Sequence, residues 1–113
     1  MHEYSLVQAL FDLVDATARA NRAFAVRRVS VRIGQGAGVE VPLLRTAYET
    51  FRVGTMCAAA PLEIREVRVE WQCPAGHGSI AAGGPLACPI CGCPARLTAG
   101  DEIVLDQVEL EVR

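Results

Sequence analysis

The chain has 113 residues, of which 51% are hydrophobic and 21% are charged, and its formal net charge is −2. This length and composition indicate one compact domain with at most a small additional module. All 11 basic residues are arginine, so the lysine-rich surface that follows a phosphate backbone is missing, and we expect no nucleic-acid partner. No segment approaches the roughly 18 consecutive apolar residues of a membrane span, and the first residues do not resemble a signal peptide. A cytoplasmic protein without a membrane partner is expected.

Apolar residues recur at spacings of three or four from residue 4 to about residue 21, which predicts an amphipathic helix. Neighbouring leucines would widen its buried stripe. Ser5 followed by Gln8 fits a capping box and places the start of the helix near Ser5. The predicted stripe consists of Val7, Phe11, Val14 and Ala18, and the leucines are Leu6, Leu10 and Leu13.

A half-buried strand and a second helix are predicted next. Apolar and polar residues alternate over residues 29–33, which is the period of a strand. The glycine-rich residues 34–38 then form a flexible turn, because they lack the spacing and the lysine of a phosphate-binding loop. Pro42 suits the first turn of a helix that ends at Gly54. The apolar face of that helix consists of Leu44, Ala47, Tyr48 and Phe51.

Two longer strands are predicted at residues 62–71 and 103–112. In each of them the apolar positions change phase once, as a single inserted residue would cause. We expect these two strands to pair with each other, which would bring Trp71 close to Arg96. The segment between them is then an excursion from their shared end.

These elements predict an α+β fold. It consists of a small mixed or antiparallel three-stranded sheet with two helices, plus an inserted hairpin domain that resembles a zinc ribbon. The helix-and-sheet domain would comprise residues 1–71 and 96–113, and the cysteine-bearing domain residues 72–95.

Four of the five cysteines lie between residues 73 and 93. Thiols of a cytoplasmic protein stay reduced, so a metal site is favoured over disulfides. The residues around these cysteines are mostly glycine, proline and other small residues, which bury too little apolar surface to become ordered alone. Zn(II) bound by four thiolate or imidazole ligands would supply the missing stability. Cys88 and Cys91, on a turn shaped by Pro89 and Gly92, form one pair of ligands.

The second pair of ligands has two possible compositions. Cys73 and His77 would complete a Cys3His site with one pair of ligands on each arm, which we favour on geometry. Alternatively Cys93 would take the place of His77, although three ligands would then crowd into six residues. The isolated Cys57 is expected to be a small buried apolar residue.

The other histidine is the second residue of the sequence. Its imidazole and backbone nitrogen, the free amine of Met1 and the backbone nitrogen of Glu3 can place four nitrogens in one plane, which suits Ni(II) or Cu(II). A histidine also occurs at this position by chance. On these residues alone, an incidental His2 therefore remains the alternative.

Short motifs occur along the whole chain in a fixed order. Together they resemble the HypA/HybF family, whose members are hydrogenase maturation factors that deliver nickel. The motifs are Met1-His2-Glu3, residues 29–34, Tyr48-Glu49-Thr50-Phe51 before Gly54, the two cysteine arms, and Gly100-Asp101-Glu102.

The resemblance implies a nickel metallochaperone and not an enzyme. It implies a transient Ni(II) site on Met1, His2 and Glu3, with Glu40 as an acidic residue near the nickel, and a structural Zn(II) in the cysteine loop. It further implies partnership with the GTPase HypB and with the precursor of the hydrogenase large subunit. The recipient could also be a urease, and the working form could be a monomer or a homodimer.

The chain departs from the family at one ligand position. The family has Cys-x-x-Cys on both arms, whereas Gly76 stands at the second cysteine position of the first arm, so His77 or Cys93 must replace that ligand. The alternative function is a zinc-ribbon module that binds protein or nucleic acid, with His2 incidental. A zinc enzyme would need an open coordination position and a nearby general base, and no histidine remains to serve.

Overall fold

The computed structural model describes residues 2–81 and 83–113, without the side chain of His2. The chain forms two compact units. The larger unit comprises Met1–Arg32, Val39–Arg65 and Val104–Arg113, and the smaller unit comprises Ile33–Gly38 and Glu66–Ile103. These bounds differ from the predicted domain boundaries near residues 71 and 96. The division into a nickel-binding and a zinc-binding domain stays a prediction. No helix among the described residues is long and apolar enough to cross a membrane.

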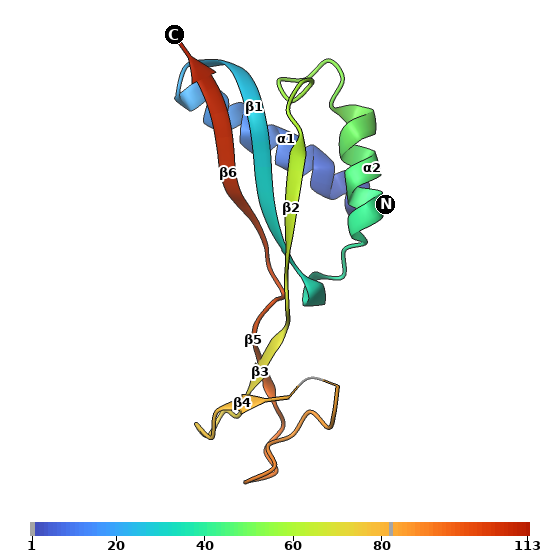
Figure 1. Cartoon of the computed structure of the whole chain (residues 1–113), viewed down its shortest axis with the longest axis vertical. Helices are drawn as coiled ribbons and strands as arrows, with labels where there is room; N and C mark the ends of the chain where they lie inside the picture. Colours follow the sequence, from blue (N-terminus) through green and yellow to red (C-terminus); the bar gives the residue numbers. More distant parts are fainter. Residues whose placement is uncertain (1, 82) are drawn as a thin grey trace. The chain divides into compact units, whose positions relative to one another are not determined.

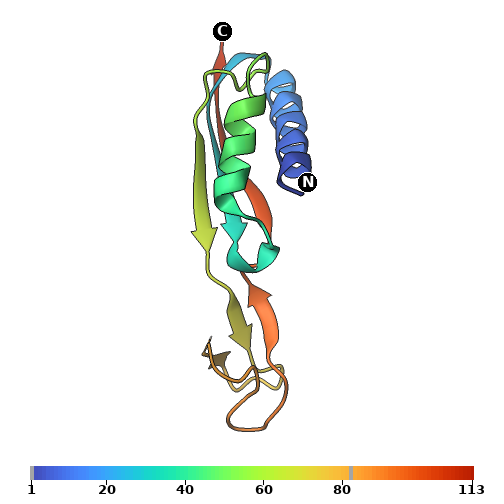
Figure 2. The same cartoon turned by 90° about the vertical axis from the view of Figure 1, so that its right-hand side faces the viewer.

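In the larger unit two helices cover one face of a three-stranded sheet (Figure 1, Figure 2). The helices are α1 (His2–Ala20) and α2 (Val41–Phe51), and the strand order is β2 (Leu62–Val67), β1 (Ala23–Gly34) and β6 (Ile103–Val112). Strands β1 and β2 run in the same direction and β6 runs in the opposite direction, so the sheet is mixed (Figure 2). The predicted α+β class with two helices and a three-stranded sheet is confirmed.

The buried face of α1 consists of the four residues that the helical period predicts. The side chains of Val7, Phe11, Val14 and Ala18 are all buried. Leu13 does not widen this stripe, because 51% of its surface is exposed. The helix also begins at His2 and not near Ser5, so the capping-box prediction is wrong.

The sheet and α2 complete the core of the larger unit. Val29, Val31 and Ile33 are buried as predicted, although β1 begins six residues earlier than the predicted strand. From α2, Leu44 and Tyr48 face the core. The hydroxyl of the fully buried Tyr48 donates a hydrogen bond of 2.8 Å to the carbonyl oxygen of Ala60. A buried hydroxyl without such a partner would destabilise the fold, so this bond fixes α2 against the loop before β2.

The predicted pairing of residues 62–71 with residues 103–112 is wrong within this sheet. Both β2 and β6 pair with β1, which lies between them. The phase of apolar residues shows which face of a strand is buried, but it carries no information about the neighbouring strand. The first of the two predicted strands is also interrupted, because β2 ends at Val67 and β3 (Glu70–Gln72) begins three residues later.

Ion pairs connect the three strands of the larger unit. The guanidinium of Arg28 on β1 binds Glu63 on β2, at 3.0 Å, and Glu109 on β6. The carboxylates of Glu109 and Glu63 raise the pKa of Arg28 above its ordinary value. Arg32 pairs with Asp106 at 2.6 Å. These partly exposed pairs give this part of the sheet a hydrated, charged surface.

The smaller unit has a second, shorter sheet. Its order is β4 (Ser79–Ile80), β3 and β5 (Arg96–Ala99), and both pairings are antiparallel. Trp71 on β3 lies opposite Ile80 on one side and Leu97 on the other. Because Arg96 lies opposite Gln72, the expected proximity of Trp71 and Arg96 is confirmed to within one position. The cysteine segment is therefore an excursion between β3 and β5, as predicted.

Glycines allow two segments of the smaller unit to approach each other closely. The predicted turn at residues 34–38 contains the short 3-10 helix η1 (Gln35–Ala37). The N–H of Gly34 donates to Glu102 O at 2.8 Å, and the N–H of Gly36 donates to Gly100 O at 2.7 Å. A Cβ atom on Gly34 would lie 2.1 Å from the carbonyl oxygen of Gly100. Residue 34 must therefore be glycine because main chain occupies the space of a side chain.

We expect Gly34→Ala to lower the free energy of unfolding by about 1 to 3 kcal/mol, the usual effect of forcing a methyl group into filled space. Gly84→Ala is the matched control, because a Cβ at Gly84 meets nothing within 4 Å, and it should change stability by less than about 0.5 kcal/mol. Thermal unfolding of the two variants beside the wild type measures both effects. Equal stability of the two variants would contradict the close approach at residue 34.

Candidate metal centre

Four side chains of the smaller unit converge on one point. The ligand atoms of Cys73, His77, Cys88 and Cys91 all lie within 4.8 Å of one another. The Cys73 sulfur is 3.5 Å from His77 Nδ1 and 3.6 Å from the Cys91 sulfur, and the Cys88 sulfur is 3.6 Å from His77 Nδ1. Ligands of one tetrahedral Zn(II), with bonds of about 2.0 to 2.3 Å, lie about 3.5 to 3.8 Å apart. The donor set and its spacing fit this ion.

Two similar turns present these ligands. On the first arm the N–H of Ala75 donates to the Cys73 sulfur at 3.4 Å, and on the second arm the N–H of Ile90 donates to the Cys88 sulfur at 3.4 Å. Gly76 closes the first turn through its N–H, which donates to Cys73 O at 3.1 Å, and it has a φ of 91°. Side chains are rarely accommodated at this φ. The next residue, His77, brings its imidazole into the cluster instead.

Hydrogen bonds prepare one of the sulfurs for metal binding. The backbone N–H of His77 is the main cause that lowers the pKa of the Cys73 thiol, to about 6, although burial acts in the opposite direction. The N–H of Ala75 and the neighbouring thiols of Cys91 and Cys88 lower this pKa further. Because a metal binds the thiolate and not the thiol, Cys73 is the sulfur that is prepared for a cation at neutral pH. The pKa values of Cys88 and Cys91 are raised in the same cluster, so these thiols would lose their protons as a metal binds.

The same cysteines also form the core of the smaller unit. Cys73 and Cys88 are 5% and 4% exposed, and they cluster with Ile80, against which Trp71 and Ala95 pack. This cluster is too small to stabilise a unit of this kind by burial alone. A metal that joined the two arms would therefore act as part of the core.

The remaining two cysteines stand outside the group of four. Cys57 is 2% exposed in the larger unit, where burial raises the pKa of its thiol, so the prediction of a buried apolar residue is confirmed. Cys93 is partly exposed and does not belong to the group of four ligand atoms. The structure thus brings together the predicted set with His77 and not the alternative with Cys93.

Of the residues predicted to bind nickel, Glu3 lies in the first turn of α1 and Glu40 directly precedes α2. Met1 and the side chain of His2 fall outside the described residues. Glu3 and Glu40 do meet, because the backbone N–H of Glu40 donates to a carboxylate oxygen of Glu3 at 3.3 Å. Residue 40 directly precedes α2, so the first turns of both helices lie next to each other. Helical periodicity does not reveal this contact, and the sequence indicated Glu40 only through the family resemblance.

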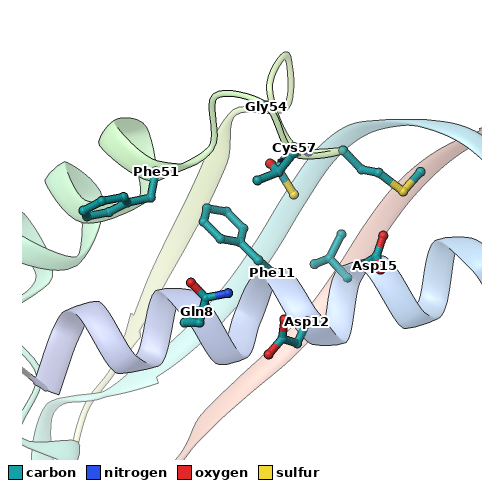
Figure 3. Close-up of a pocket in the computed structure, with 10 residues that line it drawn as sticks. Gln8, Phe11, Asp12, Asp15, Phe51, Gly54 and Cys57 are labelled. Carbon is teal, nitrogen blue, oxygen red and sulfur yellow. Dashed lines mark hydrogen bonds between the residues drawn. The ribbon is translucent and has the colours of Figure 1, made fainter.

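A pocket of about 370 Å³ in the larger unit contains none of the predicted metal ligands. Figure 3 shows Phe11 projecting from α1 towards Cys57, with Gln8 and Asp12 on the same helix. Its lining residues are Gln8, Phe11, Asp12, Val14, Asp15, Phe51, Gly54, Thr55, Met56 and Cys57.

The fold and the Cys3His cluster describe a small metal-binding protein, and comparisons with known proteins identify its family. Residues 1–110 match the family described as hydrogenase/urease nickel incorporation metallochaperone, HypA. The chain is 39% identical over 112 residues to the hydrogenase maturation factor HypA of Nitrosospira multiformis, covering 97% of each chain. It is 37% identical over 114 residues to that of Aquifex aeolicus, covering 99% of each.

Solved structures of HypA proteins match the fold of this chain. The solution structure of the Ni metallochaperone HypA from Helicobacter pylori matches with a TM-score of 0.75 at 31% identity, over 98% of each chain. A further solution structure of a HypA protein matches with a TM-score of 0.78 at 31% identity, over 100% of this chain and 98% of the other. The chain belongs to the HypA family of nickel-incorporation metallochaperones.

We expect His77→Ala to weaken zinc binding at least about tenfold, equivalent to 1.4 kcal/mol or more, because one of four ligands is lost. Cys93→Ala should retain zinc and thermal stability, because its sulfur lies outside the cluster. Zinc competition with a chromophoric chelator and thermal unfolding measure both variants. Loss of zinc from Cys93→Ala together with retention by His77→Ala would show that the alternative ligand set is the right one.

Proposed function

We propose that this chain binds Ni(II) at its amino terminus and delivers it to the large-subunit precursor of a [NiFe]-hydrogenase. The observation that carries the proposal is membership of the nickel-incorporation family over residues 1–110, a match that includes the Met1-His2-Glu3 start. This membership favours nickel delivery over a zinc-ribbon module with an incidental histidine.

The proposed nickel site consists of nitrogen atoms. The amine of Met1, the imidazole of His2 and the backbone nitrogens of His2 and Glu3 would form a square plane, the geometry that Ni(II) accepts from strong nitrogen donors. The first N–H groups of a helix have no partner within the helix, and α1 begins at His2. Nickel can therefore use these backbone nitrogens without breaking the hydrogen bonds of α1.

Glu3 and Glu40 would support this site in different ways. The Glu3 carboxylate accepts the N–H of Glu40, so it holds the start of α1 beside the start of α2. The backbone nitrogen of Glu3 then remains for the metal. Glu40 follows from the family resemblance as an acidic residue near nickel, and its contact with Glu3 supports that placement.

Delivery requires a site that releases its ion. A micromolar affinity, about −8 kcal/mol, allows transfer to a tighter acceptor. A terminal site on the first turn of a helix meets this requirement because it is open to an incoming ligand. We further propose that the GTPase HypB assists the transfer and that both steps take place in the cytoplasm.

We propose Zn(II) as the resident ion of the smaller unit, held by Cys73, His77, Cys88 and Cys91. Zinc would cross-link the two arms and neutralise the charge of the thiolates. Four protein ligands complete a tetrahedron and leave no position for a substrate. The role of this ion is therefore structural.

We expect His2→Ala to abolish nickel binding in the micromolar range, a loss of at least about a hundredfold or 2.7 kcal/mol. Zinc content and thermal unfolding should match those of the wild type, because the substitution leaves the zinc ligands and the buried core residues of both units in place. Calorimetric titration of untagged, zinc-loaded protein with nickel measures the effect.

An amino-terminal extension is a second test, because it converts the Met1 amine into an amide. The same extension at the carboxyl terminus is the matched control and should leave nickel binding unchanged. Unaltered nickel affinity in both His2→Ala and the amino-terminal extension would exclude the proposed site.

Nickel affinity should also depend on pH. An imidazole has an ordinary pKa near ~6.5 and a terminal amine near ~7.7 to 8, and both must lose a proton to bind metal. Protons compete with nickel below these values, so affinity should fall at least about a hundredfold from about pH 7.5 to about pH 5.5. The measurement is a nickel titration at each pH. A constant affinity would be incompatible with nitrogen ligands.

A further inference from the structure

Solvent reaches the five thiols of this chain unequally. Cys57, Cys73 and Cys88 are only 2%, 5% and 4% exposed. Cys91 is exposed and Cys93 is partly exposed. A small oxidant dissolved in water therefore reaches these last two residues more readily than the other three, and they are two positions apart in the sequence.

The turn that carries both residues holds them side by side. Gly92 between them has a φ of 74°, its N–H donates to Cys88 O at 2.8 Å, and the N–H of Cys88 donates to Cys93 O at 2.8 Å. The backbone N–H and the thiol of Cys93 lie near enough to the Cys91 sulfur to act on its pKa. Cys91 is one of the four clustered ligands, whereas Cys93 is outside the cluster. Cys93, a partly exposed thiol outside the cluster, thus adjoins Cys91, an exposed residue of the cluster.

We propose that Cys93 is an oxidant-responsive thiol that releases zinc by forming a disulfide with Cys91. The inference rests on the zinc site proposed above. It gives Cys93 a function that the four-ligand set does not require, and it makes the ligand set sensitive to peroxides.

The reaction balances with hydrogen peroxide as the oxidant. The Cys93 thiolate attacks one peroxide oxygen, the O–O bond breaks, and the products are a sulfenic acid on Cys93 and hydroxide. The Cys91 sulfur then attacks the sulfenic sulfur, the S–S bond forms, and a second hydroxide leaves. Two electrons pass from the two sulfurs to the peroxide. A thiol reductant reverses the change.

The disulfide removes one of the four zinc ligands. Its sulfur no longer carries the negative charge that binds the ion, so Cys73, His77 and Cys88 hold zinc alone. Because Cys73 and Cys88 are also the core of the smaller unit, loss of zinc would loosen this unit. The larger unit has its own core, so its free energy of unfolding would not change.

The test uses full-length, untagged, zinc-loaded protein and hydrogen peroxide, with zinc release followed by a chromophoric chelator. The wild type should release zinc as it loses two thiols and 2 mass units, and peptide mapping should find the bond between Cys91 and Cys93. Cys93→Ser should bind zinc equally before oxidation and release it at least about fivefold more slowly, because its first oxidation step is missing. Cys57→Ala, which removes a buried thiol, is the control and should release zinc at the wild-type rate.

Three outcomes would overturn the proposal. The first is equal rates of release from Cys93→Ser and the wild type. The second is a disulfide between Cys73 and Cys91 in the wild type, whose sulfurs are 3.6 Å apart. In both cases the zinc site itself would stand. The third is loss of zinc from Cys93→Ser before oxidation, which would show that Cys93 is a ligand. Purification of the wild type without zinc would overturn the zinc site and the proposal together.

Discussion

The smaller unit depends on the burial of sulfur beside sulfur. Cys73 and Cys88 occupy the centre of a core whose only other buried member is Ile80 among the described residues. Thiolates placed this close repel one another, and burial deprives them of water, so the arrangement is unfavourable without a cation. With a cation it becomes the strongest link between the two arms. Metal binding and folding of this unit would therefore be one equilibrium, and the short strands β3, β4 and β5 would need no large apolar face.

The two proposed metal sites differ because their tasks differ. The proposed zinc ligands are side chains from two separate arms, so release would require the arms to part or a ligand to be removed. The proposed nickel ligands belong to consecutive residues, so release would require no change in the core. Anchoring by Glu3 and Glu40 gives this start a fixed place beside α2. Under this proposal the same chain would provide a stable scaffold and an exchangeable cargo site, without competition between their ligands.

The sequence predicted most of what depends on local pattern. The helical stripe from Val7 to Ala18 and the fold class are confirmed, because periodicity reports directly on the buried face of each element. The pairing of the two later strands was predicted wrongly, because β1 lies between them and no local pattern encodes a neighbour. The start of α1 was misplaced because Ser5 resembles a cap, whereas the helix begins at His2. The contact between Glu3 and Glu40 joins residues 37 positions apart and has no sequence signal.

Arg28 has a consequence for how the larger unit comes apart. Its guanidinium contacts acidic residues that are 35 and 81 positions away in the sequence, one on each flanking strand. When either strand detaches, the arginine keeps only one of its two carboxylate partners. The two edges of the sheet are thereby coupled through a single side chain. Both edges of β1 thereby gain a side-chain contact besides their backbone pairing, and a strand edge that stays paired is closed to another chain.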